Sequence, residues 1–188
     1  MNKQAKYWET SYLAGKWDYL FSPDELGHHL ILLGYIVYVC RARRVLDVGC
    51  GAGRLLELLL PYRLDKYVGL DISAEAIEQS RRLADQHSNI ELHIADMDIF
   101  SPAEAFDVVV FNECIYCSVD PLGALEKAAG WLTPHGALLL SICREVYRGD
   151  LEKYWQLTSP SFTTRQANTV SNRLGLTWDV RMLCRNKA

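Results

Sequence analysis

Apolar and polar positions follow two different rhythms along this chain, and the change between them predicts its elements. From residue 45 onward, short runs rich in valine, isoleucine and leucine alternate with longer segments in which apolar residues recur at helical spacing. This alternation is typical of a parallel β-sheet whose strands are joined by crossover helices. The expected strands are residues 45–49, 67–73, 89–96, 106–112 and 137–142, and the expected helices are residues 54–61, 74–87 and 120–132.

Local signals support these boundaries. Ser73 is predicted to cap the helix that follows it, and Pro61 is predicted to end the helix before it. Residues 106–112, FDVVVFN, are nearly all apolar, as expected of a central strand buried on both faces. The segment TPHG, residues 133–136, is predicted to be a turn that leads into the fifth strand.

The C-terminal segment, residues 166–185, fits either a helix plus a strand or two strands joined around Leu174 and Gly175. Its threonine, valine and asparagine residues are weak helix formers, and apolar side chains keep a period of two from Leu176 to Met182. We therefore predict a β-hairpin, which brings the sheet to seven strands with the last one antiparallel.

A chain of 188 residues is long enough for one sizeable core, and we expect one domain. Within it we expect an N-terminal helical cap or lid in residues 1–44, a core in residues 45–145, and a C-terminal loop and β-hairpin in residues 146–188. Hydrophobic residues make up 49% of the chain and charged residues 23%, as in ordinary soluble proteins.

Charge and targeting signals narrow the function classes. The formal net charge of -3 argues against general attraction to nucleic acid. The longest apolar stretch, residues 30–40, is too short to span a membrane, and the N-terminus does not read as a signal peptide. We expect a cytoplasmic protein without a membrane or nucleic-acid partner, whose six cysteines are reduced thiols.

A glycine-rich turn follows the first strand. In DVGCGAG, residues 47–53, the glycines Gly49, Gly51 and Gly53 occupy alternate positions directly before a helix. Such glycines let the backbone approach a ligand and expose N–H groups at a helix N-terminus. A dinucleotide fingerprint would end in glycine or alanine where this chain has Arg54, so a dinucleotide is disfavoured.

The second strand ends with an acidic residue, Asp71, which lies 18 residues after Gly53. A carboxylate at about this spacing, roughly 20 residues, reaches ribose hydroxyl groups in related folds. Because the glycine turn and Asp71 end consecutive strands of one predicted sheet, together they indicate a nucleoside ligand.

Five motifs in order, VLDVGCGAGRL, VGLDIS, IADMDIF, FDVVVFNECIY and WLTPHGALLL, resemble those of class I S-adenosylmethionine-dependent methyltransferases. The terminal segments are also similar to a bacterial subgroup of small methyltransferases. The resemblance implies a Rossmann-like, doubly wound α/β fold with a seven-stranded sheet in the order 3-2-1-4-5-7-6. It also implies S-adenosyl-L-methionine as methyl donor and S-adenosyl-L-homocysteine as product.

The resemblance implies roles for the positions that match. Asp71 would hold the ribose diol, Ile72 would pack on adenine, and Asp96, with Met97 beside it, would accept a hydrogen bond from the adenine amino group. Asp47 would either contact the methionine part through water or brace the glycine turn, and bracing is slightly favoured. The other expected cofactor contacts are Gly49, Cys50, Gly51, Gly53, Asn112 and Trp17.

Methyl transfer to oxygen or nitrogen requires loss of a proton, for which a general base commonly contributes about 10²- to 10⁴-fold. Glu113 and Tyr116 follow the fourth strand and are the first candidates, with His29 and its neighbour His28 as further candidates if the N-terminal segment folds over the cleft. The alternatives are that Glu113 orients the loop or holds the cofactor's amino group, and that the histidines are packing residues.

The expected function is methyl transfer from S-adenosylmethionine to oxygen or nitrogen of a small molecule by in-line displacement. A carbon acceptor, a protein or peptide methyltransferase and a non-catalytic S-adenosylmethionine-binding module remain alternatives, and monomer or homodimer is undecided. The pair Cys114 and Cys117 has no partner pair at zinc spacing, so no metal site is expected. The aromatic residues before position 22 either line a lid or staple the N-terminal segment to the core.

Overall fold

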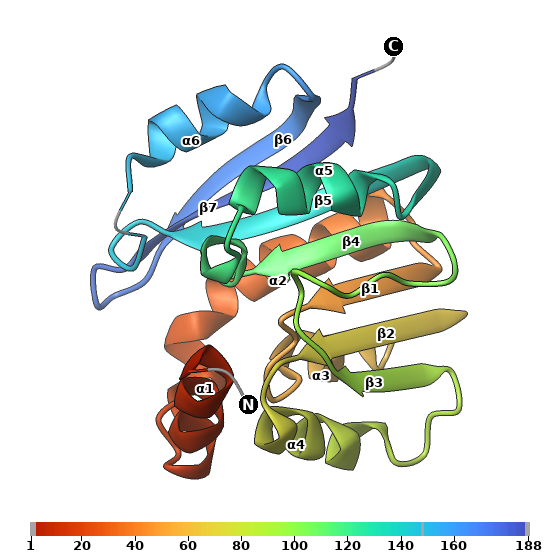
Figure 1. Cartoon of the computed structure of the whole chain (residues 1–188), viewed down its shortest axis with the longest axis vertical. Coiled ribbons are helices and arrows are strands. Elements are labelled where there is room, and N and C mark those ends of the chain that lie inside the picture. The colour runs from red at the N-terminus through yellow and green to blue at the C-terminus, as the bar shows by residue number, and fades with distance from the viewer. Residues whose placement is uncertain (1–2, 148, 187–188) are drawn as a thin grey trace.

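Seven strands form one sheet, and helices cover both of its faces (Figure 1). The computed structural model describes residues 3–147 and 149–186. The strands are β1 (Arg44–Val48), β2 (Lys66–Asp71), β3 (Ile90–Ile94), β4 (Phe106–Asn112), β5 (Leu132–Cys143), β6 (Phe162–Ser171) and β7 (Thr177–Arg185). The α-helices are α1 (Lys3–Leu13), α2 (Leu26–Gly34), α3 (Arg54–Leu59), α4 (Ala74–Ala84), α5 (Pro121–Ala129) and α6 (Leu151–Thr158), and shorter helical turns are η1 (Asp18–Phe21), η2 (Pro23–Glu25), η3 (Tyr35–Val39) and η4 (Ile115–Cys117).

The strand order is β3-β2-β1-β4-β5-β7-β6. Neighbouring strands among β1 to β5 are parallel, and β7 is antiparallel to both β5 and β6. The predicted order, the antiparallel last strand and the Rossmann-like fold class are therefore confirmed. The carboxyl ends of the parallel strands meet at one edge of the sheet, on the left of Figure 1, which is the edge where open α/β sheets bind ligands.

The core has two layers, one on each face of the sheet. Val109 and Phe111 of β4 belong to the cluster that includes α5 and α6, whereas Val108 and Val110 belong to the cluster that includes α2 and α3. Side chains alternate between the faces of a strand, so a strand covered on both faces must be apolar at successive positions. This explains the uniform apolar run of residues 106–112.

The C-terminal hairpin is confirmed. Strands β6 and β7 pair from Phe162 opposite Arg185 to Ser171 opposite Thr177. In the connecting turn Gly175 has a φ of 83°, and the Asn172 side-chain oxygen accepts hydrogen bonds from the backbone of residues 174 and 176. Glycine tolerates this left-handed conformation and asparagine mimics a backbone turn, so the residues between the strands favour a hairpin.

Two expectations about connecting segments were wrong. Residues 151–158, expected to be loop, form α6, whose first turn is capped by Asp150 and which buries Tyr154 and Trp155 against the sheet. Residues 133–136, expected to be a turn, lie inside β5, where the register with β4 shifts between Phe106 and Val108. A bulge absorbs extra residues without ending the strand, which explains the second difference.

The N-terminal segment folds back over the carboxyl edge of the sheet. Helix α1 lies beyond the ends of the strands (Figure 1) and is fixed to the start of α4 by Glu9. One oxygen of Glu9 accepts hydrogen bonds from the Ser73 hydroxyl at 2.7 Å and the Glu75 N–H at 3.1 Å. A carboxylate near a helix N-terminus satisfies free N–H groups and is favoured by the helix dipole.

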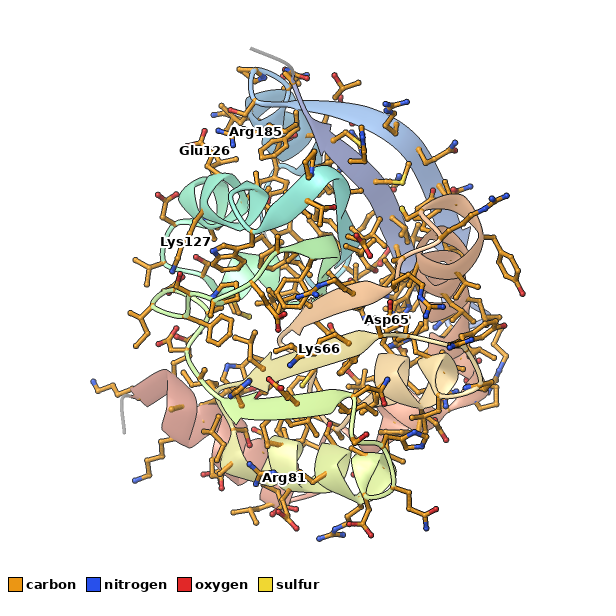
Figure 2. The ribbon with its side chains drawn as sticks, turned by 90° about the vertical axis from the view of Figure 1, so that its right-hand side faces the viewer. Asp65, Lys66, Arg81, Glu126, Lys127 and Arg185 are labelled. Atoms are coloured by element: carbon orange, nitrogen blue, oxygen red, sulfur yellow. The ribbon has the colours of Figure 1, made fainter. Side chains whose placement is uncertain are left out.

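The opposite edge of the sheet carries charged surface groups. Figure 2 views this side and labels Asp65 and Lys66 at the amino end of β2. Asp65 forms an ion pair with Arg43, and Lys66 forms one with Glu91. Exposed pairs of this kind contribute little to stability, about 0 to 1 kcal/mol each. The two edges of the sheet therefore differ in character, and a cavity of ≈ 310 Å³ lies at the carboxyl edge.

Candidate active site

A cavity of ≈ 310 Å³ lies at the carboxyl edge of the sheet, beneath the N-terminal segment. The ends of all the strands except β6 reach it or lead into it, and residues between Gln4 and His29 close it from the other side. The structure brings together every side chain predicted for the cofactor or the acceptor, with the exception of Gly53. The sequence placed these residues on separate strands, and the parallel sheet gathers them at one edge.

The glycine turn after β1 forms one wall of the cavity. Gly51 has a φ of 55°, and a Cβ atom there would lie 2.6 Å from the hydroxyl oxygen of Tyr12 in α1. Gly53 has a φ of 88° but does not line the cavity; a Cβ atom there would lie 2.7 Å from the Ser80 hydroxyl oxygen of α4. Both φ values lie in the left-handed region that favours glycine, and a Cβ atom would in addition crowd Tyr12 at Gly51 and Ser80 at Gly53.

Asp71, at the end of β2, faces the turn. Its carboxylate accepts hydrogen bonds from the Gly51 N–H at 3.0 Å and from the Ser73 N–H at 2.9 Å. Burial raises the pKa of Asp71 to about 6, and these backbone hydrogen bonds oppose the rise. A carboxylate oxygen has more than one acceptor site, so the backbone bonds orient Asp71 and leave capacity for a ligand's hydroxyl groups.

Asp47 is buried behind the turn. One of its oxygens accepts a hydrogen bond from the Tyr67 hydroxyl at 2.7 Å, whereas the other is buried without a partner. Burial raises the pKa of Asp47 to about 7. The Tyr67 contact agrees with a bracing role, and the unpaired oxygen, on a residue that lines the cavity, leaves an acceptor for a bound ligand.

The remaining predicted cofactor contacts lie around the glycine turn and the ends of β2 and β3. Trp17 packs against Trp8 with ring centroids 5.2 Å apart, and its indole Nε1 is buried without a partner. The Asp96 side chain accepts a hydrogen bond from the Asp98 N–H at 3.0 Å. The other predicted cofactor residues that line the cavity here are Gly49, Cys50, Ile72 and Met97.

Glu113, directly after β4, has a φ of 56°, which is uncommon for a residue other than glycine. Its carboxylate accepts hydrogen bonds from the Ser141 hydroxyl and the Tyr116 hydroxyl, both at 3.2 Å. Burial raises the pKa of Glu113 to about 8, although its hydrogen bonds act in the opposite direction. Backbone strain of this kind gathers at functional sites, and a pKa near neutrality suits a general base.

Tyr116 has a different character from Glu113. Its pKa is raised above the ordinary value, first by burial and then by the charge of Glu113. Its hydroxyl therefore keeps its proton at neutral pH and donates a hydrogen bond to Glu113. Of these two predicted catalytic residues, Glu113 is the one with the properties of a base.

His29 forms hydrogen bonds through both of its ring nitrogens. Its Nδ1 lies 2.8 Å from the Glu25 carbonyl oxygen, and its Nε2 lies 3.0 Å from Nδ2 of Asn112. Because a carbonyl oxygen only accepts, Nδ1 carries the proton and Nε2 accepts from the Asn112 amide. Burial lowers the pKa of His29 to about 4, so the ring is neutral.

This arrangement fixes Asn112 as well. The Asn112 Nδ2 is used by His29, and the Asn112 Oδ1 is buried without a partner. The lone pair that His29 would need as a base is therefore occupied, and His29 positions Asn112. His28 stacks on Trp178 with ring centroids 4.6 Å apart, and burial lowers the pKa of His28 to about 2.

Glu25 is a cavity residue that the sequence analysis missed. It ends η2, is 4% exposed, and lines the cavity together with Tyr19 from η1. A signal existed in the sequence, because Glu25 lies three and four residues before the two histidines and one helical turn places such residues together. Trp178 of β7 was also missed as a cavity residue, because no local sequence signal connects it with the residues that follow β4.

The cysteines and Arg144 have partners that argue against other roles. The Cys114 thiol donates to the Val48 carbonyl oxygen at 2.9 Å, and burial raises the pKa of both Cys114 and Cys117. No cluster of three or more metal-binding side chains occurs within residues 3–147 and 149–186. Arg144, just beyond β5, forms an ion pair with Asp179 at 2.6 Å.

The fold and the site together define a class of protein. Residues 41–177 match the family described as Methyltransferase domain, and this match covers most of the chain. The chain therefore belongs to the methyltransferase-domain family, and its fold is that of the class I enzymes whose methyl donor is S-adenosyl-L-methionine. The family prediction and the cofactor prediction made from the sequence are confirmed at this level.

Curated relatives include two kinds of protein. Nodulation protein S of Rhizobium tropici is 32% identical over 128 residues, which are 66% of this chain and 53% of that protein. Ubiquinone biosynthesis O-methyltransferase of Bradyrhizobium diazoefficiens is 36% identical over 100 residues, which are 52% of this chain and 39% of that protein. The aligned part of this chain thus spans about half the length of these relatives or less.

A solved structure resembles the whole fold. The N-methyltransferase NodS of Bradyrhizobium japonicum, in complex with S-adenosyl-L-homocysteine, matches with a TM-score of 0.82 at 20% identity, covering 99% of this chain and 100% of that chain. At this identity the likeness shows the fold. Among the described residues, no helix is both long and apolar enough to cross a membrane.

Proposed function

We propose that this chain transfers the methyl group of S-adenosyl-L-methionine to an oxygen or nitrogen atom of a small molecule. The observation that carries the proposal is that one cavity contains both Asp71 with the glycine turn and the carboxylate of Glu113. The first group suits a nucleoside, and the second suits an acceptor that must lose a proton. The relatives' names include an O-methyltransferase and an N-methyltransferase, so both acceptor atoms have precedent in the fold.

The residues of the cavity fit the nucleoside. The oxygen Oδ1 of Asp47, the Nε1 of Trp17 and the oxygen Oδ1 of Asn112 are buried without partners. Buried polar groups cost free energy unless they form hydrogen bonds, so these atoms suit a ligand with complementary donors and acceptors. We assign Asp71 to the ribose hydroxyls, Ile72 and Met97 to the faces of the adenine, and Asp96 to its amino group.

When bound, S-adenosylmethionine supplies a methyl group on a sulfonium sulfur, which is a good leaving group. The chain's task is then to align the acceptor and to keep water out, and such positioning can lower a barrier by roughly 7 to 11 kcal/mol. The aromatic side chains Trp8, Tyr12 and Trp17 cover the cavity from the N-terminal segment. Glu113 accepts the acceptor's proton, and Tyr116 orients Glu113 through its hydrogen bond.

Several observations favour a small acceptor without nucleic-acid or membrane partners. The cavity lies under the N-terminal segment, which leaves limited room for a macromolecule. The net charge is -3. Among the described residues that line the cavity, Arg54 is the one basic side chain other than the histidines, and it is paired with Glu57. We place this activity in the cytoplasm, with the chain acting as a monomer or a homodimer.

Calorimetry tests the proposal. S-adenosylmethionine and S-adenosylhomocysteine should both bind, and a mass-spectrometric screen of phenols, amines, glycosides and peptides should then show a gain of one methyl group on a small molecule. Failure of both nucleosides to bind would overturn the proposal. Methylation of peptides alone would replace it with a protein methyltransferase, and binding without any methylation would indicate a non-catalytic module.

A further inference from the structure

The cavity has two halves, each lying above a different group of strands. The half above β1, β2 and β3 contains the glycine turn, Asp71 and Asp96, which the proposed function assigns to the nucleoside. The other half lies above β4, β5 and β7 and is closed by η1, η2 and the start of α2. Its polar side chains include Glu113 after β4 and Glu25 at the end of η2.

Glu25 is an unusual residue for the wall of a cavity. It is 4% exposed, and the pKa of its carboxyl group is raised by burial and by the charge of Asp24, with no hydrogen bond among the causes. Its neighbour Asp24, in contrast, is paired with Arg173. A buried carboxylate without a partner costs free energy, so a carboxylate retained there suits a ligand that brings the missing charge.

Glu25 and Glu113 lie on either side of a short chain of hydrogen bonds. The Glu25 carbonyl oxygen accepts from His29, and His29 in turn holds the amide of Asn112, the residue before Glu113. The charge of Glu25 is also one of the causes that raise the pKa of Glu113. The pKa of Tyr19, which also lines the cavity, is raised first by burial and then by the charges of Glu25 and Glu113.

Among the described residues that line the cavity, no cation forms an ion pair with either carboxyl group. His28 and His29 are neutral because burial lowers their pKa values, and Arg54 is paired with Glu57. The surrounding walls include the aromatic ring of Tyr19, whose face attracts cations, and the rings of Phe21 and Trp178, which already contact Arg54 and His28. Two carboxyl groups in a partly enclosed cavity with aromatic walls are suited to bind an organic ammonium group.

We propose that the methyl acceptor is a primary or secondary amine, which binds as its ammonium form between the carboxylates of Glu25 and Glu113. This inference rests on the proposed function and narrows its acceptor atom to nitrogen. Glu25 is the recognition residue, because it has no other partner. Glu113 is both a recognition residue and the proton acceptor, because Tyr116 and Ser141 hold it in place.

The reaction balances with these groups alone. The ammonium loses one proton to the Glu113 carboxylate, and the nitrogen lone pair then forms a bond to the methyl carbon. The bond from that carbon to sulfur breaks, and its electron pair stays on sulfur to give the neutral thioether of S-adenosylhomocysteine. The product is the methylated ammonium, and the proton on Glu113 passes to solvent when the product leaves.

Matched ligand pairs test the inference on the protein saturated with S-adenosylhomocysteine. Benzylamine with benzyl alcohol, and D-glucosamine with D-glucose, differ in the amine and share most of the remaining structure. Ligand-observed NMR titrations should show at least one amine bound about tenfold more tightly than its alcohol or sugar partner, because only the ammonium forms charge-assisted hydrogen bonds. If neither pair shows an amine preference, the inference is overturned.

Two variants separate recognition from folding. Glu25→Gln should weaken amine binding by about tenfold and leave the affinity for S-adenosylhomocysteine within about twofold. Glu78→Gln, on the outer surface of α4 and 54% exposed, is the matched control and should change neither. If Glu25→Gln weakens S-adenosylhomocysteine and not the amine, Glu25 belongs to the nucleoside and the inference is wrong. Loss of nucleoside binding by the unaltered protein would instead refute the proposed function.

Discussion

The nucleoside half and the acceptor half of the cavity are built in different ways. In the nucleoside half, the carboxylate of Asp71 is held by N–H groups of Gly51 and Ser73, which lie on adjacent connections of one sheet. In the acceptor half, the Glu113 carboxylate is held by the hydroxyl groups of Ser141 and Tyr116 together with the backbone of Cys143, and no hydrogen bond is among the causes that shift the pKa of the Glu25 carboxyl group. Asp71 is thus held by backbone groups, whereas Glu113 also depends on side chains, which are free to change with the acceptor.

The largest expected effect comes from the acceptor half. Glu113→Gln keeps the size of the side chain and its capacity to bond Ser141, but it removes the base. We expect methyl transfer to fall by about 10²- to 10⁴-fold in kcat, since this is the usual contribution of a general base. S-adenosylhomocysteine affinity, measured by calorimetry, should stay within about twofold. A variant with nearly full activity would assign Glu113 to positioning and make the two halves more alike.

The next effect comes from the nucleoside half. Asp71→Ala removes charge-assisted hydrogen bonds, so we expect S-adenosylmethionine binding to weaken by more than about 1 kcal/mol, or roughly fivefold. Asp65→Ala provides the control, because Asp65 is exposed and lies at the opposite end of β2. An unchanged affinity in calorimetry would refute the ribose role of Asp71.

The pH dependence of stability connects the two halves. Burial raises the pKa of Asp71 to about 6, of Asp47 to about 7 and of Glu113 to about 8. The folded chain therefore keeps protons on these groups that the unfolded chain has already released, so their contribution to stability falls as pH rises from about 5 to about 8. The buried neutral His28 and His29 act in the opposite direction below their ordinary pKa, so the decrease should be steepest above about pH 6.5.

Calorimetric melting should thus show a Tm that decreases across this range for the ligand-free protein. Glu113→Gln should make the decrease smaller, because one of the three raised groups no longer titrates. A Tm that rises steadily between about pH 5 and about pH 8 would contradict the assignment of these carboxyl groups as buried.

The smallest effect should come from the contact that closes the N-terminal segment. Glu9→Gln weakens the bonds to Ser73 and Glu75 without changing the cavity wall, and loss of a cap contact of this kind costs about 0.5 to 2 kcal/mol. We expect S-adenosylhomocysteine to bind a few times more weakly, with faster dissociation in stopped-flow measurements. Glu78→Gln again serves as the control, and equal dissociation rates in both variants would show that α1 does not retain the ligand.

Sequence reasoning succeeded where neighbouring residues act together. The glycine turn, Asp71 and the apolar run of β4 could be recognised because each depends on local backbone geometry or on burial of successive positions. The hairpin was predicted for the same reason, since Gly175 and the period of two lie within one segment. The loop assigned to residues 151–158 was wrong because α6 is stabilised by burying Tyr154 and Trp155 against the sheet, which local propensity does not report.

The acceptor half was recognised only in part. Glu113 and Tyr116 were predicted because they follow β4, and both line the cavity, but their chemical difference arises from burial and from the hydrogen bond between them. His29 was expected to be a base, whereas its tautomer and its contact with Asn112 give it a positioning role. Glu25 was missed because its significance depends on lying opposite Glu113, which is far away in the sequence.

The sequence by itself determined the fold and the family and predicted that the glycine turn and Asp71 lie together, because hydrophobic periodicity and turn chemistry are properties of adjacent residues. Only the tertiary structure decided which carboxyl groups are paired and which are not. Charge, protonation and hydrogen bonding depend on distances through space and on exclusion of water. These become defined when the segment from Gln4 to His29 packs over the carboxyl edge of the sheet and brings Glu25 and Glu113 into one cavity.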